Sequence, residues 1–579
     1  MTRPEAFGFA ALSAMLAQVM LVALLPGCSG CDGEHDPSTA RMDAETAAAY
    51  AAIPAPGKVR LLPSWVAVTN AATASKSFVP RDGSALVRLL APGAIELPCE
   101  FSRVRSDRAC WDIALPTDLG KELGVSFDFW CGDVTQFTGF TFYFKSGKGW
   151  YATAFSPLEE RKWHRVTVRK ERTRSEGNAA GWKDVSGLRI CGWRGGTNDT
   201  QLAIANISFA DPPVTNTPAQ LAAIDRQDRE WAAKQPSKKD EWRGFWCHSA
   251  FGLGGGKSWD DTVRILKANG FNAVLPNMAW AGAAFYPSQV LPVSPKVSRL
   301  GDQLAACLAA CRSYGVECHV WNVCWNLGHH AAKAKIAELA AAGRTQVRFD
   351  GTKRDGWLCP SHPDNLAMEI QSFVELAGKG VDGIHFDYIR YPDDSFCFCP
   401  GCRARFEARH GLSLTNWPAQ VRQDAAIKDK WREFRIANIT ALVKGVSERV
   451  RKEAPGVKIS AAVFQNPTTN PGAIGQDWAA WCRAGYLDFV CPMDYNYDSS
   501  VAFKGVVFSQ KRALEGTKAA IRPGIGLSCW PDRSRDIRMA AGEILVVREA
   551  GLDGFCIFNL DARAERLLPV LHSGPTGTN

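Results

Sequence analysis

The sequence lacks two features that would place it in large classes of protein. It has no dense run of lysine and arginine, and 68 basic against 59 acidic residues leave a net charge of +9, which is modest for 579 residues. A nucleic-acid-binding surface needs clustered positive charge, so we expect no nucleic-acid partner. Beyond the first 25 residues, no stretch is long and apolar enough to cross a membrane.

The amino-terminal segment has the pattern of an export signal. Arg3 precedes an almost wholly apolar run from Phe7 to Leu25, as in secretory leaders. The Leu-Pro-Gly-Cys sequence that ends at Cys28 resembles a bacterial lipoprotein box, although its proline departs from the usual small residue. We expect 1–27 to be a lipoprotein signal peptide and Cys28 to carry lipid, which predicts an exported protein anchored in the cell envelope. An uncleaved anchor helix is the alternative.

The sequence then divides into an all-β part and an α/β part. Residues 28–57 are rich in Ala, Gly, Asp and Pro, as expected of a flexible tether. Short alternating segments with Gly-rich turns between them predict a β-sandwich over 58–211. It resembles the jelly-roll modules that accompany many carbohydrate enzymes. Several prolines mark 212–240 as a linker, in which we expect one polar helix.

From residue 241 onward, strand-like and helix-like segments alternate eight times. Eight such units over roughly 320 residues predict a (β/α)8 barrel at 241–570. The fold class is therefore α/β, with a TIM barrel preceded by an all-β sandwich. We expect the eight strands at 244–247, 272–275, 317–321, 383–387, 458–463, 487–491, 521–527 and 554–558.

Two of these strands end in carboxylates with aromatic neighbours. Asp387 closes the fourth strand and Asp494 follows the sixth. The carboxyl ends of barrel strands share one rim, where active sites lie, and glycosidic bond cleavage needs two carboxyl groups. Separations of about 5 to 5.5 Å indicate retention and about 6.5 to 9.5 Å inversion. Either aspartate could instead bind a cation, cap a helix or pair with Arg390.

The other strand ends supply amides and aromatic rings, which bind sugar hydroxyls and stack on sugar ring faces. We expect substrate-binding roles for Trp280, Asn322, Trp325, Asn326, Tyr388, Arg390, Tyr391, Gln465, Tyr495, Tyr497, Trp530 and Asn559.

A cysteine cluster follows the fourth strand. Cys397, Cys399 and Cys402 are three thiols within six positions, and a fourth ligand would complete a tetrahedral zinc site. Cys359 is the best candidate for that ligand, with His362 in reserve. The zinc would be structural, because four protein ligands leave no position for water. A disulfide pair with one free thiol is the alternative in an exported protein.

The barrel resembles the bacterial family 10 glycosyl-hydrolase-like proteins, which are distinct from the family 10 xylanases. The resemblance rests on segments 243–246, 270–274, 315–322, 357–363, 381–392, 476–481 and 485–492. Characterised relatives act on bacterial cell-wall glycan. Similarity to the wider α-galactosidase-like group implies that Asp387 is the nucleophile and Asp494 the acid/base. This chain has one aspartate before Tyr388 where many relatives have two.

Two functions fit these observations. The first is a glycoside hydrolase that acts on a polysaccharide or cell-wall glycan, without a catalytic cofactor and as a monomer. The second is a non-catalytic glycan-binding surface lipoprotein on the same scaffold. A metal-dependent deacetylase would need an open site of His and Asp ligands, and we expect His248, His319 and His385 to satisfy core hydrogen bonds instead.

Overall fold

The structure is a computed structural model that describes residues 44–577, except 115, 211, 214, 329–330, 496–498 and 528–535. The expected signal peptide and Cys28 lie outside the described residues. So do Tyr497 and Trp530, two of the expected substrate-binding residues. No helix in the described part of the chain combines the length and apolar character needed to cross a bilayer.

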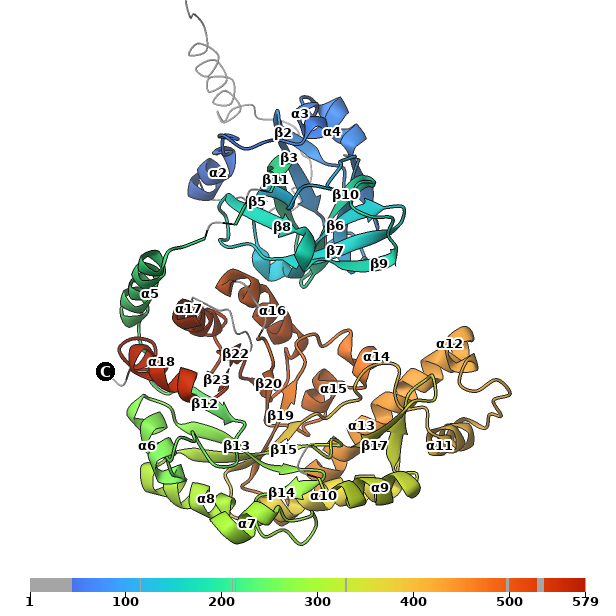
Figure 1. Ribbon diagram of the computed structural model, residues 1–579, viewed down its shortest axis with the longest axis vertical. Coiled ribbons are helices and arrows are strands. Elements are labelled where there is room, and N and C mark those ends of the chain that lie inside the picture. Colours follow the sequence, from blue (N-terminus) through green and yellow to red (C-terminus); the bar gives the residue numbers. More distant parts are fainter. Residues whose placement is uncertain are drawn as a thin grey trace, which may run out of the picture. The chain divides into compact units, whose positions relative to one another are not determined.

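The amino-terminal part contains two antiparallel sheets, coloured blue to green in Figure 1. One has the order β1-β4-β10-β6-β7-β9 and the other the order β2-β3-β11-β5-β8. Their facing sides are aromatic: the ring of Phe127 stacks on Phe142 at 5.0 Å, and Phe129 lies 5.5 Å from Phe140. Alternate residues of β5 and β6 therefore meet between the sheets, and the expected β-sandwich is confirmed.

The strands of the sandwich are β1 (Phe78–Arg81), β2 (Arg88–Ala91), β3 (Ala94–Cys99), β4 (Arg108–Ile113), β5 (Gly124–Cys131), β6 (Phe137–Ser146), β7 (Lys148–Phe155), β8 (His164–Arg169), β9 (Arg174–Asn178), β10 (Val185–Arg194) and β11 (Thr200–Phe209). The short helices of this part are α2 (Ala44–Ala51), α3 (Pro63–Val66), α4 (Ala71–Ser77), η2 (Val134–Gln136) and η3 (Lys170–Arg172).

The carboxy-terminal part is a parallel sheet that closes on itself. Its path runs β21-β20-β19-β18-β15-β13-β12-β23-β22. The two ends of this path, β21 and β22, are separated only by Arg522 and Pro523. The Arg522 N–H donates to Val490 on β20, and the Pro523 carbonyl accepts from Cys556 on β23. Residues 520–526 thus act as one strand between β20 and β23, so the expected eight-stranded barrel is confirmed.

The barrel strands are β12 (Trp242–Cys247), β13 (Ala273–Trp280), β15 (Glu317–Val323), β18 (Gly383–Asp387), β19 (Lys458–Val463), β20 (Phe489–Pro492), β21 (Ala520–Ile521), β22 (Gly524–Gly526) and β23 (Gly554–Phe558), with β14 (Ala283–Ala284) paired to β13. A separate hairpin, β16 (Thr345–Val347) and β17 (Lys353–Leu358), lies between β15 and α10.

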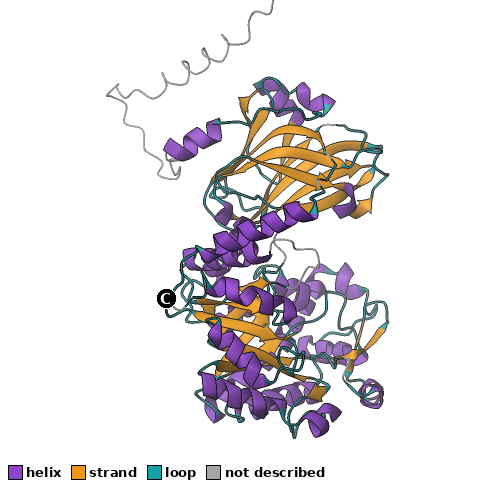
Figure 2. Cartoon of the chain, turned by 60° about the vertical axis from the view of Figure 1, so that its left-hand side comes forward, coloured by secondary structure: helices purple, strands orange, loops and turns teal. Residues whose placement is uncertain are grey.

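Helices surround these strands (Figure 2). They are α5 (Pro218–Ala233) in the linker, then α6 (Trp259–Ala268), α7 (Pro295–Leu300), α8 (Gln303–Tyr314), α9 (Lys333–Ala341), α10 (Pro363–Ala377), α11 (Pro400–His410), α12 (Gln420–Gln423), α13 (Ala425–Glu453), α14 (Asn470–Ile474), α15 (Trp478–Arg483), α16 (Ser500–Ala513), α17 (Asp536–Glu549) and α18 (Ala562–His572).

Alternation along each barrel strand separates side chains that face the interior from those that face the helices. On β18, Phe386 packs against Phe373 of α10 with ring centroids 4.2 Å apart. Its neighbour His385 instead accepts a 3.0 Å hydrogen bond from the Trp246 indole, across the interior. Asp387, two residues after His385, therefore faces the interior at the end of the strand.

The same alternation on β20 has the opposite consequence. Phe489 faces the interior, where its ring lies 5.5 Å from His319 and 5.3 Å from Trp242. Counting in steps of two, Cys491 and Met493 also face inward. Asp494 then faces the surrounding helices, and its contacts agree with this direction.

Candidate active site

Asp387 lies at the interior face of the carboxyl-end rim. Its Oδ1 accepts a 2.6 Å hydrogen bond from the N–H of Tyr388 and lies 3.8 Å from Nη1 of Arg390. The side chain is 7% exposed. Burial raises the pKa of Asp387 above its usual value, and the positive charge of Arg390 opposes that rise. The carboxyl group thus combines an apolar surrounding with one nearby cation.

Aromatic rings form a continuous series around this rim. Tyr388, which has a left-handed backbone conformation with φ of 53°, lies 6.3 Å from Trp280 between ring centroids. His248 follows, 6.2 Å from Trp280 and 5.6 Å from Trp321. The series ends where the Trp321 ring lies 6.4 Å from Phe558, and Phe558 stacks on Tyr495 at 5.1 Å. It connects the ends of β18, β13, β12, β15, β23 and β20.

Arg390 connects this series to β19. Its guanidinium group lies 4.3 Å from the centre of the Tyr388 ring and 4.5 Å from that of Phe464. Phe464 directly follows β19 and is 36% exposed. The sequence predicts that Gln465 provides the contact at this strand end, whereas the structure places Phe464 against Arg390. The signal for Phe464 was present in the sequence, because it is the first residue beyond an apolar strand.

His248 lies outside the core, contrary to the prediction from its sequence. We expected it to satisfy hydrogen bonds in the core, but it lies just beyond β12 with an exposed side chain. Its backbone N–H donates to Oδ1 of Asn559, one of the expected rim residues. His319 and His385 are fully buried, as expected. His385 lies between Trp246 and Ser460, whose Oγ is 2.8 Å from its Nδ1.

Asp494 has a different environment from Asp387. Its Oδ1 accepts a 2.9 Å hydrogen bond from Gln510 on α16, and its Oδ2 has no partner among the described residues. Burial raises its pKa to about 8, so it is mostly protonated near neutral pH. The register makes Asp387 level with Cys491, which puts Asp494 three residues further along the chain, beyond the end of β20. The described contacts do not bring these two carboxyl groups together.

Three of the expected substrate-binding residues are buried and do not line the rim. Asn322 is fully buried and donates to Ser372 on α10, because it alternates with the inward-facing Trp321. Trp325 is fully buried too, and its backbone N–H donates to Glu369 on α10. Tyr391 accepts a hydrogen bond from Asn438 on α13. Asn322 and Tyr391 therefore bind to the helix layer, and the buried side chains of all three residues do not line an open site.

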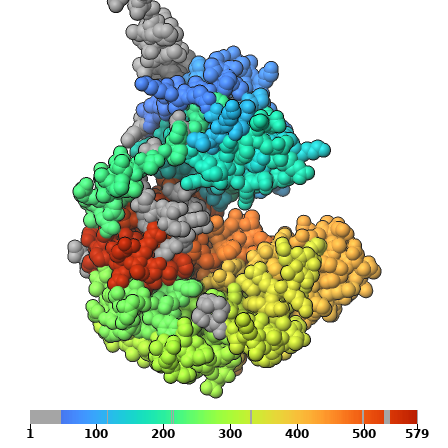
Figure 3. Space-filling view, in the orientation of Figure 1, coloured from blue at the N-terminus to red at the C-terminus, as the bar shows by residue number. Residues whose placement is uncertain are grey.

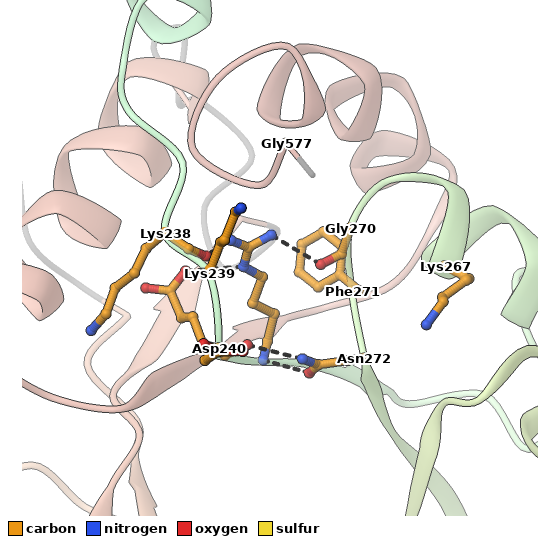
Figure 4. Close-up of a pocket in the computed structure, with 10 residues that line it drawn as sticks. Lys238, Lys239, Asp240, Lys267, Gly270, Phe271, Asn272 and Gly577 are labelled. Atoms are coloured by element: carbon orange, nitrogen blue, oxygen red, sulfur yellow. Dashed lines mark hydrogen bonds and ion pairs between the residues drawn. The ribbon is translucent and has the colours of Figure 1, made fainter. Parts of the chain in front are cut away.

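A pocket of about 370 Å³ lies at the other end of the barrel (Figure 4). It surrounds the segments that precede β12 and β13, and its lining includes Lys238, Lys239, Lys267, Phe271 and Asn272. Active sites of this fold lie at the carboxyl ends of the strands. The pocket is therefore separate from the rim that carries Asp387.

The cysteine residues expected to bind metal lie together. The Sγ atoms of Cys359, Cys397, Cys399 and Cys402 are all within 4.8 Å of one another. His362, the reserve ligand, instead caps α10, where its Nδ1 accepts from the N–H of Asp364.

Residues 254–527 match the model of a family described as Glycosyl hydrolase-like 10. No curated protein sequence matches the chain. The chain is similar to the glycoside hydrolase domain of PgaB (BpsB) from Bordetella bronchiseptica, with 15% identity over 57% of this chain and 99% of that one and a TM-score of 0.44. It is also similar to the catalytic domain of β-amylase from Paenibacillus polymyxa. The identity is 13%, the match covers 59% of this chain and 96% of the β-amylase chain, and the TM-score is 0.40.

Proposed function

We propose that the protein is a glycoside hydrolase with Asp387 as its essential carboxylate, on the premise that residues 254–527 of the barrel match the family described as Glycosyl hydrolase-like 10. The observation that carries the proposal is the inward-facing position of Asp387 within a series of aromatic rings. Such rings stack on pyranose faces and position the sugar. A carboxylate there stabilises an oxocarbenium-like transition state, either by forming a covalent bond or by activating water.

Arg390 keeps Asp387 ionised in this proposal. Burial alone would favour the neutral acid, which neither attacks the anomeric carbon nor stabilises its positive charge. The guanidinium group, 3.8 Å from Oδ1, favours the charged form. The rings of Tyr388 and Phe464 both pack against the same guanidinium group, so they restrict its movement. The exposed face of Phe464 then offers a stacking surface next to the carboxylate.

The second proposed catalytic residue is the proton donor, Asp494. Asp494 has the raised pKa that a general acid needs, and it stays our proposed acid/base by resemblance. Its contact with Gln510 places the carboxyl group in the helix layer, so the role of general acid would require it to reach the rim when substrate is bound. Replacing Asp494 by Asn tests the role: a general acid is required for turnover, whereas a positioning residue is needed mainly for the fold.

A glycan-binding protein without turnover is the second candidate. One observation favours the binding-protein function. Among the described residues, Arg390 is the charged group that shifts the pKa of Asp387, and no second carboxylate contributes to that shift. A hydrolase needs two carboxyl groups on opposite sides of the scissile bond. Turnover therefore has to be measured separately from binding.

The test uses the purified protein with cell-wall glycan strands and α-linked oligosaccharides as first substrates. Wild type should release reducing ends, and Asp387→Asn should lower turnover by about a thousandfold or more while the Kd for glycan stays within a few-fold, because only transition-state stabilisation is lost. Phe464→Ala should weaken binding by up to about tenfold, as expected for loss of one stacking contact.

Asp394→Asn is the matched control, since it makes the same chemical change at a carboxylate whose side chain is 76% exposed. It should leave both turnover and binding unchanged. Glycan binding by wild type without release of reducing ends would favour the binding-protein function. An Asp387→Asn variant with full turnover would exclude Asp387 as the catalytic carboxylate.

A further inference from the structure

Four cysteines from two separate loops meet beside the barrel. Cys359 follows β17, whereas Cys397, Cys399 and Cys402 lie between β18 and the first turn of α11. The Sγ of Cys359 is 3.8 Å from that of Cys399 and 3.4 Å from that of Cys402. Zinc–sulfur bonds of about 2.3 Å in a tetrahedron place the sulfurs roughly 3.8 Å apart. The sulfur positions therefore match a four-thiolate zinc site.

The surroundings of the cluster favour thiolates. The Cys402 N–H lies 3.3 Å from Sγ of Cys399, and the Val347 N–H lies 3.4 Å from Sγ of Cys397. The Ser361 hydroxyl is 3.3 Å from Sγ of Cys359 and 3.1 Å from that of Cys402. A zinc ion with four thiolates carries a net charge of −2, so hydrogen-bond donors around the sulfurs stabilise it. Arg405 adds a positive charge 4.0 Å from Cys359.

A second group of cysteines has only three thiols and lacks the fourth ligand of a tetrahedral site. Cys307, Cys311 and Cys318 also have Sγ atoms within 4.8 Å of one another. They lie between α8 and β15, fully within the apolar core. In the described part of the chain no fourth Cys, His, Asp or Glu joins them. Three ligands do not complete a tetrahedral structural site, so this group is a matched control within the same protein.

We infer that Cys359, Cys397, Cys399 and Cys402 bind one structural zinc ion that joins the loop after β15 to the loop after β18. These loops belong to the yellow and orange segments that lie side by side in Figure 3. Backbone hydrogen bonds join them as well: Phe398 N–H donates to the Val347 carbonyl, and Phe349 N–H donates to that of Ser395.

The zinc would also position the rim. Trp357 precedes Cys359 by two residues, and its ring lies 5.5 Å from that of Tyr388, next to Asp387. The guanidinium group of Arg354 lies 5.1 Å from the centre of the Trp357 ring and 5.2 Å from that of the Phe396 ring. Each of the two loops therefore contributes one ring that packs against Arg354. Four protein ligands leave no open position for water, so the ion takes no part in catalysis. The metal site stands independently of the proposed hydrolase function.

The first experiment is elemental analysis of the purified full chain, with X-ray absorption at the zinc edge. The expected result is one zinc per chain, with four sulfur neighbours at about 2.3 Å. Absence of zinc together with disulfides among the four cysteines in the mass spectrum would overturn the inference. Because this measurement uses wild type, it does not depend on whether a variant folds.

The second experiment compares variants. Cys397→Ser and Cys402→Ser should each lose the zinc, whereas Cys311→Ser should retain one equivalent. Addition of a chelator should lower the Tm of wild type and of Cys311→Ser, and zinc should restore it. Retention of stoichiometric zinc by Cys397→Ser, or loss of zinc only in Cys311→Ser, would contradict the assignment.

Discussion

Two buried carboxyl groups, Asp494 and Glu369, have pKa values that burial raises to about 8. Asp494 accepts one hydrogen bond from Gln510 and Glu369 accepts one from the backbone N–H of Trp325. Neither has a cationic partner among the described residues. In the unfolded chain such groups titrate near pH 4. The folded state therefore holds two protons that the unfolded state releases between about pH 4 and pH 8.

This difference predicts how stability depends on pH. Where the folded state binds more protons, the free energy of unfolding falls as pH rises, by at most about 1.4 kcal/mol per pH unit and group. The stabilisation is fully present below the unfolded pKa and is lost as pH rises through the folded pKa. Asp494→Asn removes one of the two groups, so we expect a shallower decrease in the free energy of unfolding between about pH 5 and pH 7.

Denaturant unfolding at several pH values within this range measures the slope. Asp394→Asn, at an exposed position, should retain the wild-type slope. If Asp494→Asn also retained it, Asp494 would be ionised in the folded protein, and its proposed role as a proton donor would fail as well.

At the scale of elements, closure of the barrel depends on a strand that contains proline. Pro523 has no N–H to donate, so the ladder is interrupted between β21 and β22. Gly524 follows, and a Cβ there would lie 2.6 Å from the Pro492 carbonyl oxygen and 3.1 Å from the Trp246 ring. Glycine at this position allows β22 to approach β20 while Trp246 occupies the interior.

We expect Gly524→Ala to destabilise the barrel by about 1–3 kcal/mol, since a backbone oxygen cannot move away as a flexible side chain does. Gly456→Ala makes the same change where no atom lies within 4 Å, and should alter stability by less than about 0.5 kcal/mol. Thermal and denaturant unfolding of the two variants give the comparison. Equal stability of Gly524→Ala and wild type would show that the β20–β22 contact is looser than described.

At the scale of the whole molecule, the sequence-based prediction of export and anchoring rests on residues outside the described structure. The sequence predicts that Cys28 becomes the first residue of the mature chain and carries lipid. Cys28→Ser should then move the protein from the membrane fraction to the soluble fraction, because acyl chains dominate such attachment. Cys31→Ser, three residues away, is the control and should stay with the membrane. Membrane association of Cys28→Ser would favour an uncleaved helix.

Fold class was open to sequence reasoning because it depends on local periodicity. Alternation at Val125 to Trp130 lies within β5, and the run that ends at Asp387 is β18. Local spacing also revealed the cluster of Cys397, Cys399 and Cys402. Each of these features is contained within a few consecutive residues, so the local sequence is enough to recognise it.

The direction of each strand-end side chain was decided by tertiary structure. Asp387 and Asp494 have similar sequence surroundings, yet one faces the interior and the other Gln510 on α16. One residue of register exchanges the two faces of a strand, and register is set by pairing with strands far away in the sequence. The position of Cys359 beside Cys402, 43 residues away, likewise depends on how two loops fold over the barrel. Periodicity along the chain therefore determined the architecture, and long-range strand pairing determined which residues share the site.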